Sequence, residues 1–276
     1  MIESRVIVNF NVNEKRSACH VWKAGPLAGV STEKGVNICH MSCVGVDNRP
    51  LLALLAEEPK AETLPLVFNS TWSDDAKIEL MRCFLRDLFA FLSAVAEKMG
   101  YRSLVCCSSS RGEESPFVEK TAKENRLEVL QIKDATRPRI FNTVQQQIFG
   151  AYAPPHLFLM DLYTPVFPEQ YLEMGRRLLA GADAVFGPDP FGRFYLVGLK
   201  RPLDLFQTLK WDDPECFRNL VEGCRKVGLN VHLLPLWYSI KTAEDMAFLR
   251  EHLDVKIANG TLKESSTLKF LESRGF

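Results

Sequence analysis

The run Leu51-Leu-Ala-Leu-Leu-Ala56 is wholly apolar and bounded by polar residues, which predicts a strand buried on both faces. Downstream, Ser73 is a good helix N-cap, apolar residues then recur at helical spacing as far as Met99, and Gly100 supplies a stop. A second apolar run, Ser103 to Cys107, follows. A buried strand, a helix and another buried strand predict a βαβ unit with a parallel sheet.

The same alternation continues outward from this unit to about residue 253, which predicts one α/β domain over 49–253. Further strands are expected at 127–132, 157–160, 183–187, 194–198 and 231–234, and further helices at 116–124, 139–149, 168–179, 215–227 and 242–252.

The two ends of the chain differ from this central pattern. Residues 1–48 carry β-like runs, Val6 to Phe10, Ala18 to Trp22 and Val36 to Met41, separated by Gly, Asn and Lys, and predict a small β-rich extension. Residues 254–276 form a charged tail with one expected helix, Leu262 to Leu271, which could pack on the body or on a second subunit. A homodimer is therefore left open.

Composition excludes several classes of protein. A chain of 276 residues with 46% apolar residues can bury a core without disulfide or metal support. The formal net charge is zero and the basic residues are scattered, which argues against a nucleic-acid partner. No signal-peptide pattern or membrane-length apolar run is found, and eight irregularly spaced cysteines favour reduced thiols. The expected location is the cytoplasm.

Four separated motifs resemble a bacterial family of glycosyltransferase-like proteins. They are Gly181-Ala-Asp-Ala-Val-Phe-Gly-Pro188, Phe194-Tyr-Leu-Val-Gly-Leu199, Gly228-Leu-Asn-Val-His-Leu-Leu-Pro235 and Thr242-Ala-Glu-Asp245. The family comprises nucleotide-diphosphosugar transferase-like proteins of the arsenosugar-biosynthesis type, and it is related to the 2-phospho-L-lactate guanylyltransferases. The resemblance implies a three-layer glycosyltransferase A-like fold, with a mainly parallel mixed sheet flanked by helices.

The resemblance also implies a nucleotide above the carboxyl ends of the strands, with Mg²⁺ or Mn²⁺ held by aspartates and bridging the phosphates. No organic cofactor is implied. Asp161, after the strand 157–160, matches a family aspartate that binds metal, and Asp189 is a weaker candidate within Gly187-Pro-Asp-Pro-Phe-Gly-Arg-Phe194. In that loop the family's own aspartate and second glycine are replaced by Phe191 and Arg193.

Basic residues are the candidates for phosphate binding. Lys60 follows Pro59, where the family has a glycine and a Lys-Thr-Arg element, and Arg139 matches a family arginine. Lys241, in Ser239-Ile-Lys-Thr242, replaces the family's pair of carboxylates and could neutralise a diphosphate without metal, as could Arg193. Trp211 and Asp212 match a position that suggests an acceptor pocket, although a tryptophan there could equally cover the core.

Two functions remain as hypotheses. The first is glycosyl or nucleotidyl transfer from a nucleotide-activated donor, with altered metal and phosphate motifs. The second is a non-catalytic protein of the same fold that senses a nucleotide or binds a protein partner.

Overall fold

The computed structural model describes residues 31–33, 36–38, 47–61, 72–108, 114–132, 140–207, 209, 213, 215–240 and 242–275. The chain divides into two compact units, 1–46 and 47–276. In the first, β1 (Ser31–Glu33) pairs antiparallel with β2 (Val36–Ile38), so a strand begins at Val36 as expected. The runs expected at 6–10 and 18–22 lie outside the described residues.

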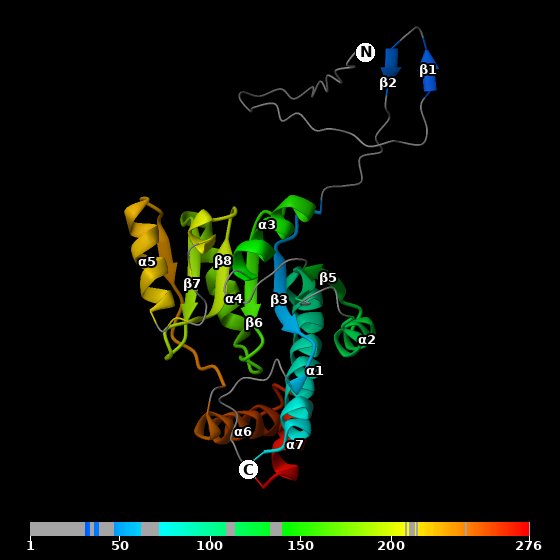
Figure 1. Ribbon diagram of the computed structural model, residues 1–276, viewed down its shortest axis with the longest axis vertical. Coiled ribbons are helices and arrows are strands. Elements are labelled where there is room, and N and C mark those ends of the chain that lie inside the picture. Colours follow the sequence, from blue (N-terminus) through cyan, green and yellow to red (C-terminus); the bar gives the residue numbers. More distant parts are fainter. Residues whose placement is uncertain are drawn as a thin grey trace. The chain divides into compact units, whose positions relative to one another are not determined.

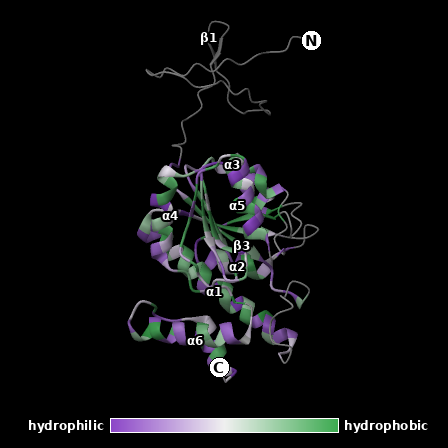
Figure 2. Cartoon of the chain, turned by 90° about the vertical axis from the view of Figure 1, so that its left-hand side faces the viewer, coloured by the Kyte–Doolittle hydropathy of each residue, from purple (hydrophilic) through white to green (hydrophobic). Residues whose placement is uncertain are grey.

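The second unit is built on a seven-stranded sheet in the order β5-β4-β3-β6-β8-β7-β9. Only β8 runs antiparallel to its neighbours, so the sheet is mixed and mainly parallel. Helices lie on both sides of it, with α4 and α5 on opposite sides in Figure 2, which confirms the predicted fold class. The strands are β3 (Leu51–Glu57), β4 (Arg102–Ser108), β5 (Glu128–Ile132), β6 (Leu157–Asp161), β7 (Ala184–Pro188), β8 (Phe194–Leu199) and β9 (Val231–Leu233).

Side chains of β3 alternate between two apolar layers, as the period of a strand requires. Leu52 and Leu54 belong to the layer formed with α1, α2, α4, α6 and α7, whereas Leu51 and Ala53 belong to the layer formed with α3, η4 and α5. The helices are α1 (Asp74–Met99), α2 (Pro116–Glu124), α3 (Ile140–Tyr152), α4 (Glu169–Gly181), η4 (Asp204–Gln207), α5 (Cys216–Lys226), α6 (Ala243–Ala258) and α7 (Ser266–Ser273).

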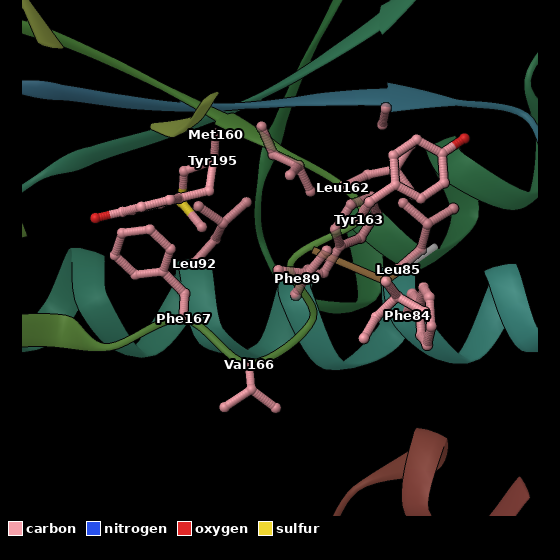
Figure 3. Close-up of a cluster of buried hydrophobic side chains, with 14 of the residues drawn as sticks. Phe84, Leu85, Phe89, Leu92, Met160, Leu162, Tyr163, Val166, Phe167 and Tyr195 are labelled. Atoms are coloured by element: carbon pink, nitrogen blue, oxygen red, sulfur yellow. The ribbon is translucent and has the colours of Figure 1, made fainter. Parts of the chain in front are cut away.

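Helix α1 begins and ends where the sequence predicts. The Ser73 side chain accepts a hydrogen bond from the Ala76 amide, and Gly100 closes the helix at φ 69°, a left-handed conformation that glycine adopts without strain. Phe89 and Leu92 of α1 are fully buried under the sheet, near Phe167 and Tyr195, whose rings lie 5.7 Å apart (Figure 3). One broad apolar stripe of α1 therefore packs against the sheet.

The C-terminal helices differ from the prediction. Helix α6 starts at Thr242 through a capping box with Asp245, but it continues past His252 to Ala258 because its stop signal is Asn259-Gly260, with Gly260 at φ 73°. Helix α7 covers Ser266–Ser273 instead of 262–271. It packs on α1, where Asp87 accepts hydrogen bonds from Ser265, Ser266 and Thr267. The expected helix of the tail thus packs on the body.

No helix in the described part of the chain is long and apolar enough to cross a membrane.

Candidate functional site

The order of the strands defines where a ligand would bind. Strands β3, β4 and β5 follow one another toward one edge of the sheet, and β6 then returns to the other side of β3. In open α/β sheets, ligands bind at the carboxyl ends of the strands where the direction of winding changes. Here that position lies between the ends of β3 and β6, at the end of the sheet that faces α6 and α7 in Figure 1.

Polar residues end three neighbouring strands at this position. Asp161, the last residue of β6, pairs in register with Leu55 of β3, and Glu57 pairs with Ser108 of β4. Because Leu55 and Glu57 are two residues apart in one strand, Glu57, Ser108 and Asp161 share the sheet face covered by α3 and α5. Asp161 is only 8% exposed. The structure thus places Asp161 and Glu57 on adjacent strand ends, with their backbone positions offset by two residues, about 7 Å along the strand direction.

The turn between β7 and β8 is organised by the second aspartate candidate, Asp189. Its Oδ1 accepts hydrogen bonds from the amides of Phe191 (2.9 Å) and Arg193 (2.8 Å), and its Oδ2 accepts one from the Ser239 hydroxyl (3.0 Å). The Asp189 amide also donates to the Arg193 carbonyl. Asp189 is 5% exposed, and its hydrogen bonds hold the turn in place. The Arg193 side chain is half-buried.

The segment 237–240, which precedes α6, is held by hydrogen bonds to two other segments. Ser239 binds Asp189, as described, and the Ile240 amide donates to the carbonyl of Tyr163, two residues beyond Asp161. The Trp237 indole adds a bond of 2.8 Å to the Val166 carbonyl. These contacts bring the end of β6, the β7–β8 turn and the segment 237–240 together. No local pattern indicated that Ser239 would join them.

Four of the predicted site residues lie outside the described residues: Arg139, Trp211, Asp212 and Lys241. Lys60, which follows β3, is described and half-buried. The segments 62–71, 109–113 and 133–139, which follow β3, β4 and β5, also lie outside. Of the eight predicted residues, the structure therefore describes Lys60, Asp161, Asp189 and Arg193, and it places the last three on segments that are joined by hydrogen bonds.

Glu58, which sequence analysis passed over, binds the start of α2. Its Oε1 accepts a hydrogen bond from the Phe117 amide (3.2 Å) and its Oε2 accepts one from the Val118 amide (3.1 Å). The N-terminus of a helix attracts anions, phosphate among them. Here a carboxylate of the protein occupies it. The sequence shows that Glu58 follows the first buried strand, but its partners on α2 lie 59 and 60 residues away along the chain.

Cys107, near the end of β4, is a buried thiol. Its Sγ donates to the Ser115 hydroxyl at 3.1 Å, and burial raises its pKa to about 11. A thiol with so high a pKa is a poor nucleophile at neutral pH, so covalent catalysis by this cysteine is not favoured.

The donor atoms fit a metal ion only when a ligand shares its coordination. Across the described ranges, no group of three or more His, Cys, Asp or Glu side chains could hold a metal by itself. Mg²⁺ is, however, commonly held by one or two carboxylates together with substrate phosphates and waters. Asp161 and Glu57 satisfy that smaller requirement.

Sheet order, winding and helix placement define the fold of the nucleotide-diphosphosugar transferase class. Residues 91–213 match the sequence family described as "Uncharacterized protein conserved in bacteria (DUF2064)". The comparison with curated proteins gave no match.

One solved structure shares the architecture, and two others align with lower scores. A protein of Desulfovibrio desulfuricans G20, described as a "putative nucleotide-diphospho-sugar transferase", aligns over 81% of this chain and 94% of its own, with 19% identity and a TM-score of 0.69. A cytidylyltransferase of Leptospira borgpetersenii aligns over 82% and 93%, with 14% identity and a TM-score of 0.49. The 4-diphosphocytidyl-2C-methyl-D-erythritol synthase of Anaerococcus prevotii aligns over 75% and 100%, with 11% identity and a TM-score of 0.48.

These comparisons confirm the resemblance found in the sequence as a likeness of family and of fold. The chain has a nucleotide-diphosphosugar transferase-like fold. At 19% identity, the likeness to the Desulfovibrio protein establishes the architecture alone. The chemistry of this chain has to be argued from its own residues.

Proposed function

We propose that the protein binds a nucleotide or nucleotide-sugar at the carboxyl ends of β3 and β6 and transfers a glycosyl or nucleotidyl group from it. The observation that carries this proposal is the placement of Asp161, a buried carboxyl group that ends a central strand at the change of winding, on the same face as Glu57. The likeness to a nucleotide-diphospho-sugar transferase fold supports it.

In this proposal Asp161 and Glu57 hold Mg²⁺ or Mn²⁺ against the phosphates of the donor. The metal supplies neutralisation of the charge that develops on the leaving phosphate. Basic side chains are proposed to assist it: Lys60 and Arg193, which the structure describes, and Arg139 and Lys241, which lie outside the described residues. Trp211 and Asp212 are proposed to contact the acceptor. The protein contributes positioning and electrostatic stabilisation without a covalent intermediate.

A second function, nucleotide sensing or protein binding without catalysis, is favoured by two contacts. The Asp189 carboxylate accepts hydrogen bonds from the β7–β8 turn, and the Glu58 carboxylate accepts them from the start of α2. Both positions lie at the carboxyl edge, and both groups stabilise the fold in ways that compete with binding a metal or a phosphate. The cytoplasm remains the expected compartment, because the five described cysteines are buried free thiols.

The decisive experiment is a calorimetric titration of nucleoside triphosphates, nucleoside diphosphates and nucleotide-sugars, with and without Mg²⁺ or Mn²⁺. We expect binding that strengthens with metal, and a loss of at least about tenfold in the metal-dependent affinity for Asp161→Asn. Asp204→Asn is the matched control, because Asp204 is an exposed aspartate in η4, after β8, at the opposite end of the sheet.

The outcomes separate the two functions. Metal-dependent binding together with release of pyrophosphate or nucleoside diphosphate supports the transferase. Binding that is equal with and without metal, unchanged in Asp161→Asn and free of turnover, supports the sensor. If no nucleotide binds, both the transferase and the nucleotide sensor are excluded.

A further inference from the structure

Helix α6 presents apolar side chains on two opposite sides. Met246, Leu249 and Leu253 are at most 2% exposed and anchor the helix to the core. On the other side, Phe248 is 57% exposed and Val255 is 58% exposed. These two residues are seven positions apart, about two helical turns, so they lie on one outward stripe. Figure 2 shows that hydrophobic and hydrophilic residues alternate along α6.

The exposed ring of Phe248 is held in one position. It packs edge-on against Tyr238 at 4.9 Å between ring centroids, and the Tyr238 hydroxyl contacts His252 Nδ1 at 2.9 Å. Leu236, close by in the sequence, is 60% exposed. Large apolar side chains that remain exposed while their neighbours are fixed are typical of a binding surface.

The charges at the two ends of α6 are opposite in sign, so this helix is complementary to the same helix of a second copy. The first turn carries Glu244 and Asp245, and the last turn carries Lys256. Among the described residues, neither Glu244 nor Lys256 belongs to an ion pair. If two such helices cross antiparallel, the acidic first turn of each faces the basic last turn of the other, and the helix dipoles also oppose one another favourably.

We infer that the outer face of α6, defined as Phe248, Glu251 and Val255 with the charged turns at either end, binds a second copy of this chain through an antiparallel two-fold contact. Phe248 of each copy packs toward Val255 of the other when the two-fold axis passes between Glu251 and His252, because the two positions are equidistant from that point. Glu251, which is exposed between them, lies next to the two-fold axis. Such a contact is isologous and closes as a dimer.

The inference stands apart from the proposed function, since it concerns association of the chain and requires no nucleotide. Sedimentation equilibrium and light scattering measure it directly. We expect a dimer for the unmodified protein, and a dissociation constant at least about tenfold higher for Phe248→Asp and for Val255→Asp. Val227→Asp is the matched control, because Val227 is 61% exposed but follows α5. It should leave the dimer unchanged.

A charge-reversal cycle tests the orientation of the helices. Glu244→Lys and Lys256→Glu should each weaken the dimer, and the double variant should recover most of the loss, because the two charges meet across the contact. Glu251→Cys should form a disulfide-linked dimer under mild oxidation, whereas Arg218→Cys, exposed on α5, should not. Thermal unfolding of each variant confirms that it is folded.

A monomer at concentrations of about 100 µM overturns the inference, as does a dimer that Val227→Asp disrupts as strongly as Phe248→Asp. A dimer whose Glu251→Cys variant fails to cross-link overturns the antiparallel arrangement. Association of this face only with a different protein, while the chain itself stays monomeric, also overturns it.

Discussion

Asp161 and Asp189 lie at the same end of the sheet and are almost equally buried, at 8% and 5% exposure, yet the protein uses them differently. Asp189 follows β7 and binds two amides of its own turn together with the Ser239 hydroxyl. Asp161 ends β6 in register with β3 and shares a face with Glu57. One carboxylate builds the loop that follows its strand, and the other belongs to a row of polar strand ends.

The difference shows that burial and residue type do not reveal which contacts an aspartate makes. Asp87 makes the same point from inside α1, where it accepts three hydrogen bonds from the start of α7. Aspartates that accept hydrogen bonds from several backbone amides stabilise the fold, because without the carboxylate each buried amide would have no hydrogen-bond partner. This contrast can be tested by substitution.

The largest effect is expected at Asp189. Asp189→Ala removes the acceptor of two amides and one hydroxyl, and should lower the free energy of unfolding by about 2–4 kcal/mol in urea titrations. Asp189→Asn keeps one acceptor oxygen and should cost about half as much. A loss of less than about 1 kcal/mol for Asp189→Ala would contradict the role of this carboxylate in holding the turn.

The next largest effect is expected at Asp87, which fastens α7 to α1. Asp87→Ala should lower the free energy of unfolding by about 1–3 kcal/mol, because the amides of Ser266 and Thr267 lose a charged acceptor. Hydrogen exchange should accelerate in α7 before it does in the sheet. Unchanged exchange in α7 would show that its apolar side, with Leu268 and Leu271, is sufficient to hold the helix.

A smaller effect is expected at Glu58. Glu58→Gln removes the negative charge at the start of α2 but keeps an oxygen acceptor, so the loss of stability should be about 0.5–1 kcal/mol. Glu124→Gln, at the other end of α2, serves as the control and should be neutral or slightly stabilising, because a negative charge is unfavourable there. Equal losses in the two variants would contradict a role for the helix dipole.

The smallest effect concerns pH. Burial is the main cause that lowers the pKa of His156 and of His252 below 6.5. The unfolded chain therefore binds protons more readily, and stability should fall as pH drops below 6.5, by at most about 1.4 kcal/mol per pH unit for each histidine. His156→Gln should flatten this slope in urea titrations between about pH 5 and 7. An unchanged slope would assign the effect to other groups.

Much of the fold could be predicted because its signals are local. The cap at Ser73 and the stop at Gly100 bound α1, and the unbroken apolar run beginning at Leu51 marks a central strand. The predicted end of α6 at His252 is wrong because the charged residues that follow do not stop a helix. Leu253 is in fact buried, and the glycine that stops the helix comes at position 260.

The candidate site was only partly predictable. Asp161 was predicted because it matches an aspartate of the family that the sequence resembles, and the structure places it at the end of β6. Glu58 and Ser239 were not found, because their partners, Phe117 and Val118 in one case and Asp189 in the other, are about 50 residues or more away in the sequence. No local pattern encodes such distant contacts.

The sequence by itself determined the class of fold and the ends of its clearest helix, since hydrophobic periodicity and capping act over a few residues. The tertiary structure decided which carboxylates stabilise loops, which remain at strand ends, and that α6 keeps Phe248 and Val255 exposed. The reason is physical: hydrogen bonding and burial depend on which distant segments meet, and only the folded chain brings those segments together.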